Sequence, residues 1–459
     1  MLLQLLSATA STVDDRKLQI GERNYILIDE EIVVSSPAPY TAVSYAWGSG
    51  RKPDPLHDGH NISDRTIAVL TACAQHRPIQ TRFWVDAFCV HLPEGSEAQN
   101  RDLESMGFIY NAAAEVIVVL SPGAQAVLRE IVISDGLEWK GLSDPSLLKL
   151  EDEDWISRAW TYQELVNQNL IFFTCEDAED VLVDGSQFLN ALGYSLSLLR
   201  NRGSDLSNSP RLNAFEDAIQ NWRISGYCGR SALQVMANMD NRVAGRPEDH
   251  FYAMIGALTT KPKSELKQTE ASEAFMVACE AKNDYSFIYS AAPRSTIDGR
   301  KWRPKASLDI RAILPWSCSG EGQPGRFEND TLILEKMAIF QPNPLDLIGT
   351  DFLNQWLTTI GFIKKKKQKR ELADASLRYL ISIGFRSCDQ CVYLSCGLFF
   401  PYESVPSEVV CSIAISTTVF WVFGAPGIAY YEEEDKRRYI PGVFVGDTRT
   451  SALVDIHLY

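Results

Sequence analysis

The chain carries little positive charge for its length. Among its 459 residues, 44 lysines and arginines stand against 59 aspartates and glutamates, and the formal net charge at pH 7 is −15. An acidic surface repels phosphate backbones and anionic lipid leaflets, so nucleic acid and membranes are disfavoured as partners. One basic run, Lys364–Arg370, departs from this balance. It is compatible with a nuclear-localisation signal, a local phosphate-binding patch or a solvated loop.

The ten cysteines lack the dense, short spacing of a secreted disulfide framework, and a reducing compartment is the simpler interpretation. Cys388-Asp-Gln-Cys391 has part of a zinc-site spacing. No second pair follows it closely and no histidine is near it in sequence, so free buried thiols are favoured. We therefore expect no bound metal and no resident cofactor.

A membrane-spanning helix is also disfavoured. The N-terminus is apolar but has no basic region ahead of its short apolar run, which argues against a signal peptide. The segment Val409–Tyr431 has no charged residue, yet it contains serines, threonines and a Gly-Ala-Pro-Gly sequence at 424–427. This composition predicts two buried strands flanking a turn rather than a spanning helix. A soluble, cytoplasmic protein is expected, with the nucleus as the alternative.

Between Tyr40 and Thr174, short apolar runs alternate with amphipathic stretches. Strands are predicted at 40–47, 83–90, 115–121 and 170–174, and helices at 63–76, 96–114 and 154–168. This alternation predicts a mostly parallel sheet, holding Val43, Val85, Val118 and Phe172 and covered by helices.

The rest of the chain is organised differently. Four further helices are predicted at 186–200, 213–224, 231–239 and 249–258. Residues 391–424 are rich in strand-forming residues, so the C-terminal part is expected to be α+β and strand-rich. The predicted organisation is an extension over 1–39, an α/β domain over 40–185, its helical continuation over 186–265 and a C-terminal region of unknown role over 266–459.

The segment Asp154–Glu164 offers the clearest chemistry. On a helix, Trp160 and Glu164 are four residues apart and share a face. An aromatic ring can stack on a base while a neighbouring carboxylate accepts hydrogen bonds from ribose hydroxyls or stabilises an oxocarbenium-like transition state. The alternative is that Trp155 and Trp160 are core anchors and Glu164 forms a cap or a surface pair, since helical periodicity usually reports packing.

Other candidate residues lie where the predicted strands end. Ser44 and Tyr45 would sit at the carboxyl edge of the sheet, where open α/β folds bind ligands, and Asp86 lines the same crevice or is bonded to a neighbouring turn. Gly48-Ser-Gly50 lacks the third glycine of a dinucleotide fingerprint. No kinase, protease or P-loop signature is present.

Four blocks in order resemble the HET domain of fungal heterokaryon-incompatibility proteins: Tyr40–Gly48 (YTAVSYAWG), Phe83–Val90 (FWVDAFCV), Gln99–Leu120, and Arg158–Glu164 (RAWTYQE). The segment Asn241–Gly256 resembles one that often follows this domain. The sequence departs from the family after the second block, where Val90-His91-Leu92-Pro93 replaces the usual Asn-Gln. A ligand-contacting loop would therefore be altered here.

The resemblance implies a role in non-self recognition and programmed cell death, and a distant likeness to TIR domains, with a TIR/flavodoxin-like fold. Carried over from catalytic TIR domains, it makes Glu164 the candidate catalytic carboxylate in NAD hydrolysis. Ser44, Tyr45, Trp47, Asp86 and Trp160 are the candidate substrate-binding residues. The alternatives are a non-catalytic signalling module that self-associates or recruits protein partners, and a nuclear regulatory factor that uses the Lys364–Arg370 run.

Overall fold

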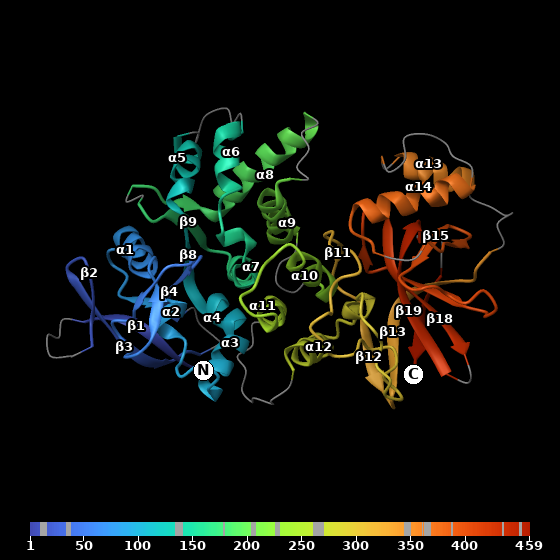
Figure 1. Cartoon of the computed structure of the whole chain (residues 1–459), viewed down its shortest axis with the longest axis horizontal. Coiled ribbons are helices and arrows are strands. Elements are labelled where there is room, and N and C mark those ends of the chain that lie inside the picture. Colours follow the sequence, from blue (N-terminus) through green and yellow to red (C-terminus); the bar gives the residue numbers. More distant parts are fainter. Residues whose placement is uncertain are drawn as a thin grey trace. The chain divides into compact units, whose positions relative to one another are not determined.

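The computed structural model describes the chain except for residues 10–15, 34–37, 134–140, 178–179, 203–207, 225–229, 260–269, 344–349, 360, 362–368, 387–388, 434–435 and 449–451. The chain divides into two compact units (Figure 1). Unit 1 comprises Met1–Ile224 and Arg242–Gln268, and unit 2 comprises Ser225–Asn241 and Thr269–Tyr459.

Unit 1 is built on a mixed eight-stranded sheet in the order β10-β9-β8-β4-β7-β1-β3-β2. The strands are β1 (Leu2–Thr9), β2 (Leu18–Ile20), β3 (Arg23–Glu31), β4 (Ala38–Tyr45), β7 (Arg82–Trp84), β8 (Ala113–Leu120), β9 (Ile171–Cys175) and β10 (Val183–Asp184). The four central strands β9, β8, β4 and β7 are parallel, and the outer strands pair antiparallel. Residues 1–39 thus contribute three strands to this sheet rather than standing apart from it.

Helices surround the sheet of unit 1, and the α/β class predicted for this part of the chain is confirmed. They are α1 (Thr66–His76), α2 (Asp86–Cys89), α3 (Glu97–Glu104), α4 (Met106–Ala112), α5 (Gln125–Ile133), α6 (Asp144–Leu150), α7 (Ala159–Val166), α8 (Gly185–Asn201), α9 (Pro210–Ile224) and α11 (Glu248–Leu258). A small hairpin, β5 (Arg51–Pro53) with β6 (Asn61–Ser63), follows β4. Because helices cover both faces of the parallel strands, residues 116–120 of β8 are buried without alternation.

The second predicted strand, Phe83–Val90, is wrong beyond its first two residues. Strand β7 ends at Trp84, Val85 follows it, and residues 86–89 form helix α2. The Asp86 carboxylate accepts the backbone N–H of Ala87 at 2.7 Å, and the Val85 carbonyl accepts the N–H of Cys89 at 2.8 Å. These local bonds compete with sheet pairing in a run whose residues otherwise favour a strand.

The long helix predicted at 96–114 is divided into α3 and α4 at Ser105, and β8 begins at Ala113. Helix α4 lies against α11 through Gly107, where a Cβ atom would come within 2.1 Å of the Gly256 carbonyl oxygen and 2.5 Å of that of Thr259. Helix backbones approach this closely only where a side chain is missing.

We expect Gly107→Ala to lower the free energy of unfolding of unit 1 by about 1–3 kcal/mol, because the added methyl group meets backbone atoms that cannot rotate away. Urea unfolding followed by tryptophan fluorescence measures this loss. Gly123→Ala is the matched control, since the nearest atom to its Cβ is the Ser121 hydroxyl at 3.8 Å. Equal stability of both variants would show that α4 and α11 are not packed as described.

Unit 2 is strand-rich, as the sequence predicted. Its main sheet runs β12-β13-β16-β18-β19-β15-β14, with β20 paired to β13, and every pairing is antiparallel. The strands are β12 (Gly325–Glu328), β13 (Thr331–Phe340), β14 (Val392–Leu394), β15 (Gly397–Pro401), β16 (Ser412–Ser416), β18 (Gly424–Glu433), β19 (Lys436–Gly446) and β20 (Leu453–Leu458). A two-stranded pair joins β11 (Ser319–Gly320) to β17 (Val419–Phe420). The helices are α10 (Ala232–Met239), α12 (Ala271–Ala281), α13 (Thr350–Thr359) and α14 (Lys369–Ser382).

The uncharged segment Val409–Tyr431 forms strands β16 and β17 and most of β18, which confirms the strand prediction. The predicted turn at 424–427 is wrong: these residues begin β18, and the chain turns at Val422 and Phe423 instead. Among the described residues, no helix is long and apolar enough to cross a membrane. Most of the Lys364–Arg370 run lies outside the described residues, and Lys369 and Arg370 begin α14.

Candidate active site

A cavity of about 330 Å³ opens in unit 1 beside the carboxyl ends of β4 and β7. Its walls come from β4, the loop around the β5–β6 hairpin, α2, α3, α7 and the segment that leads into α11. The lining residues include Tyr45, Trp47, Asp54, His60, Asn61, Asp86, Glu94, Gln99, Met106, Arg158, Trp160, Glu164, Arg246 and Asp249. In parallel sheets this edge is the usual place for a ligand, because the loops after the strands leave an open crevice there.

Glu164 is held in the cavity wall by a directed chain of hydrogen bonds. The Trp155 indole Nε1 donates to the Ser44 hydroxyl at 2.7 Å, and that hydroxyl donates to Oε2 of Glu164. Trp155 and Ser44 are buried, and Glu164 is only 5% exposed. Since the indole can only donate, it fixes the Ser44 hydroxyl as a donor toward the carboxyl group.

Burial raises the pKa of Glu164 from 4.5 to about 8, and the nearby negative charge of Asp86 adds to this shift. The Ser44 hydrogen bond and the positive charge of Arg158 oppose the rise. The pKa of Asp86 is also raised, chiefly by desolvation, although Trp47 Nε1 donates to its Oδ2 at 2.7 Å. Two carboxyl groups with raised pKa values that face one cavity are typical of functional sites.

Aromatic side chains form the rest of the binding surface. Trp160 is half-buried and stacks on Tyr252 of α11, with ring centroids 6.5 Å apart and planes 9° from parallel. Trp47 has Arg51 over its ring at 5.5 Å. Tyr45 is buried, and its hydroxyl bonds to Thr66 Oγ1 at 2.9 Å. These contacts fix the orientation of the rings that line the cavity.

The structure brings the sequence-predicted site residues together. Five of the six line the cavity: Tyr45, Trp47, Asp86, Trp160 and Glu164. Ser44 lies beneath the wall and contacts Glu164, so its position is that of a positioning residue rather than of a direct substrate contact. Trp155 is a core residue, which matches the packing interpretation for that side chain alone. The chemical roles of all these residues stay predictions.

Sequence reasoning gave no role to several lining residues, of which Arg158, Arg246 and Asp249 are the most informative. Arg158 lies in the Arg158–Glu164 block, and Arg246 and Asp249 lie in the segment Asn241–Gly256, so charged residues inside these two motifs were the available signal. The two motifs are joined in space. Ala159 N–H donates to the Val243 carbonyl at 2.9 Å, and Arg242 Nη1 donates to the Arg158 carbonyl at 3.0 Å.

His91, which follows the altered family position, does not line the cavity. Its ring Nδ1 and backbone N–H both bond to Oδ2 of Asp102, at 2.6 and 2.9 Å. The loop it belongs to nevertheless reaches the cavity through Val90 and Leu92.

No group of three histidine, cysteine, aspartate or glutamate side chains in the described part of the chain is placed to hold a metal ion. Cys388 lies outside the described residues, and Cys391 forms no disulfide within the described part of the chain. The other cysteines without a disulfide in the described ranges are Cys73, Cys89, Cys175, Cys279, Cys318, Cys396 and Cys411.

The raised pKa of Glu164 predicts how stability depends on pH. Between about pH 4.5 and 8 the folded protein keeps this proton and the unfolded chain releases it. Stability from this group is therefore full below pH 4.5 and is lost as the pH rises toward 8, by about 1.4 kcal/mol per pH unit.

Urea unfolding at pH 5.5 and 7.5 tests this. We expect the wild type to lose roughly 2–3 kcal/mol more than Glu164→Gln over this interval, because glutamine does not titrate. An equal loss in both proteins would mean that Glu164 is ionised in the folded state throughout.

Comparison with known proteins is informative for one part of the chain. Residues 40–164 match the family model described as heterokaryon incompatibility protein (HET). No curated protein and no solved structure matches the chain. The match begins at β4 and ends at Glu164, so it spans both the parallel strands β4, β7 and β8 and most of the cavity wall. Residues 40–164 are therefore a HET domain of the kind found in heterokaryon incompatibility proteins.

Proposed function

We propose that this protein acts in non-self recognition and programmed cell death, and that its HET domain hydrolyses the nicotinamide–ribose bond of NAD in the cavity beside Glu164. The observation that carries the proposal is the position of Glu164. It is a carboxyl group with a raised pKa in the wall of a cavity, four residues from a half-buried tryptophan and held by a directed hydrogen-bond chain.

The size and charge of the cavity suit part of this substrate. About 330 Å³ lies at the lower end of the range for small-ligand sites, roughly 300–1,000 Å³, and suits the nicotinamide and its ribose. Acidic side chains outnumber basic ones among the lining residues, which favours the positively charged nicotinamide ring. Arg158 is the cation available to the pyrophosphate, whereas Arg246 is already paired with Glu94.

The fold supports the likeness to TIR domains. If the parallel strands β4, β7, β8 and β9 are numbered 1 to 4 along the chain, their order across the sheet, from β7 to β9, is 2-1-3-4. This is how the strand order of flavodoxin-like sheets begins, and such sheets bind ligands at the carboxyl ends of their strands. Strand β8 ends at Leu120, directly before Ser121, and Glu164 lies on α7, which precedes β9.

In the proposed reaction, the bond between nicotinamide nitrogen and ribose C1′ breaks, and neutral nicotinamide leaves with the bonding electrons. Positive charge develops on the ribose, and ionised Glu164 stabilises it. Water then forms the new bond to C1′, and its proton is released to the carboxylate or to solvent. The products are ADP-ribose, nicotinamide and one proton. Trp160 offers a ring face for stacking, and Ser44 holds the carboxylate in place.

A non-catalytic signalling module is the second candidate. It is favoured by the near-complete burial of Glu164, because a buried carboxyl group bonded to Ser44 also serves the core. The deciding experiment incubates the concentrated full-length protein with NAD and follows nicotinamide release by chromatography. Release above the uncatalysed rate supports the enzyme. Intact NAD and intact NADP under these conditions would leave the signalling module as the function.

A further inference from the structure

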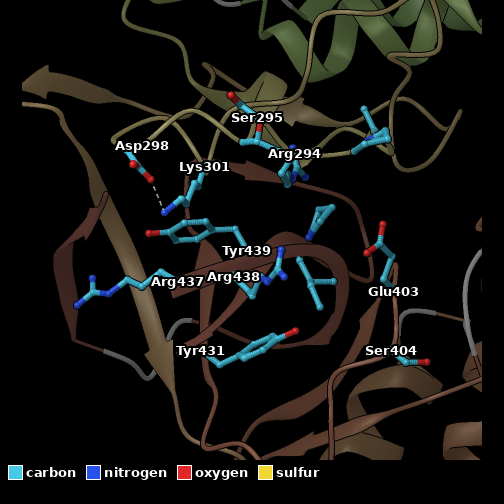
Figure 2. Close-up of a pocket in the computed structure, with 15 residues that line it drawn as sticks. Arg294, Ser295, Asp298, Lys301, Glu403, Ser404, Tyr431, Arg437, Arg438 and Tyr439 are labelled. Carbon is cyan, nitrogen blue, oxygen red and sulfur yellow. Dashed lines mark ion pairs between the residues drawn. The ribbon is translucent and has the colours of Figure 1, made fainter. Parts of the chain in front are cut away.

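Unit 2 contains a cavity of about 630 Å³ that plays no part in the site above. Its walls come from the segment after the short helix Ser286–Tyr289, from the end of β18, from the start of β19 and from the loop after β15. Figure 2 shows Arg294, Ser295 and Lys301 on one side of it and Tyr431, Arg438 and Tyr439 on the other. Its lining residues include Arg294, Ser295, Thr296, Asp298, Lys301, Glu403, Ser404, Tyr431, Arg437, Arg438 and Tyr439.

Arg294 has unused hydrogen-bonding capacity in this wall. Its Nη2 donates to the Ser290 carbonyl at 3.2 Å. Its Nε and Nη1 are buried and have no acceptor among the described residues. Buried guanidinium N–H groups that lack an acceptor are costly, because they have lost water and gained nothing in return. Burial lowers the pKa of Arg294 to about 10, so the side chain stays charged at neutral pH.

The remaining charges around the cavity make it a cationic site in an acidic chain. Four basic side chains line it against two acidic ones, while the whole chain carries −15. One of the acids, Asp298, already pairs with Lys301 at 2.7 Å. The other, Glu403, is exposed and forms no ion pair with Arg294 in the described structure. An added anion therefore finds a surplus of positive charge here.

We propose that this cavity binds a small organic phosphate, with the guanidinium of Arg294 as the fork that grips the phosphate oxygens. A guanidinium presents parallel N–H donors that match phosphate oxygens in pairs. A phosphate monoester carries about −1.5 to −2 charge at pH 7, so the positive charge of this wall attracts it. The volume leaves room for a sugar or nucleoside attached to the phosphate.

The test uses the full-length protein at pH 7.5 with three probes: AMP, inorganic phosphate and adenosine. We expect AMP, and more weakly phosphate, to bind in calorimetry and to raise the melting temperature, whereas adenosine does neither. Arg294→Met should weaken AMP binding at least tenfold and leave the melting temperature without ligand equal or higher. Arg294→Lys keeps the positive charge but loses the paired N–H donors, so its affinity for AMP should lie between those of the wild type and Arg294→Met.

Arg437→Met is the matched control. This residue also lines the cavity, but its guanidinium lies 4.1 Å from the Tyr459 ring centroid, bonds to Glu432 at 3.3 Å and is directed away from Arg294 (Figure 2). Its removal should change AMP affinity less than threefold.

Failure of both AMP and phosphate to bind would overturn the proposal, as would binding that survives in Arg294→Met. A large drop in the melting temperature of Arg294→Met would assign this side chain a structural role instead. Because this site and Glu164 lie in different units, Glu164→Gln should bind AMP here like the wild type. Failure of this proposal therefore leaves the proposed NAD hydrolysis untouched.

Discussion

Replacing Glu164 with glutamine is expected to reduce nicotinamide release to the uncatalysed rate. The variant keeps the shape of the side chain but cannot carry the negative charge that the developing ribose cation requires. Glu164→Asp should also be poor, because one missing methylene withdraws the carboxylate from the reacting carbon. Release is measured by chromatography at pH 7.5, with the melting temperature of each protein recorded beside it.

The stability of the glutamine variant separates a chemical role from a structural one. At pH 7.5 its melting temperature should equal or exceed that of the wild type, since glutamine relieves the cost of burying an ionisable group. Glu97→Gln is the matched control, because Glu97 is an exposed residue in the first turn of α3 and should keep full activity. Wild-type turnover that persists in Glu164→Gln would remove Glu164 from the reaction.

The pH dependence of turnover follows from the same group. With a pKa near 8, Glu164 is mostly protonated in the free protein at pH 7, and the proposed reaction needs the ionised form. We expect kcat/KM to rise with pH between 6 and 8 and then to level off, as the fraction of ionised carboxylate does. A profile that is flat over this range in the wild type would contradict an essential carboxylate with a raised pKa.

The central strands of unit 1 were predictable from the sequence because their apolar runs are long and continuous. Val43, Val118 and Phe172 lie in parallel strands as predicted, whereas Val85 falls just beyond β7. The reason is local. The Asp86 carboxylate accepts a hydrogen bond from the backbone N–H of Ala87, and a sequence pattern that favours a strand gives no sign of this bond. The pairing of residues 2–9 with β7 was equally hidden, since pairing between distant segments leaves no local periodicity.

The candidate site was predictable only where strand ends and helix spacing locate it. Trp160 and Glu164 share a face of α7, and Ser44 and Tyr45 close β4, so geometry alone brings them together. Asp54, His60 and Arg246 reach the same cavity from loops, whose course depends on tertiary packing. The cavity of unit 2 had no sequence signal, because Arg294 and Arg438 are distant along the chain and belong to no recognisable motif.

Truncation of Trp84 is expected to cost more stability than truncation of Trp160. Trp84 ends β7 at 1% exposure and meets Tyr110 edge to face, with ring centroids 5.4 Å apart. We expect Trp84→Ala to lower the free energy of unfolding by about 3–5 kcal/mol, because a large cavity remains in the core. Trp160 is half-buried at the cavity wall, so Trp160→Ala should cost roughly 1–2 kcal/mol, for one lost ring contact and partial burial.

Urea unfolding followed by circular dichroism gives both values at pH 5.5, where Glu164 is protonated in the folded protein. Binding should show the reverse order: Trp160→Ala weakens NAD binding if its ring stacks on the ligand, while folded Trp84→Ala binds like the wild type. Trp84 packs in the core because strand β7 directs its side chain there, whereas α7 places Trp160 beside the cavity. Equal losses of stability in the two variants would mean that the ring of Trp160 belongs to the core and is not available to a ligand.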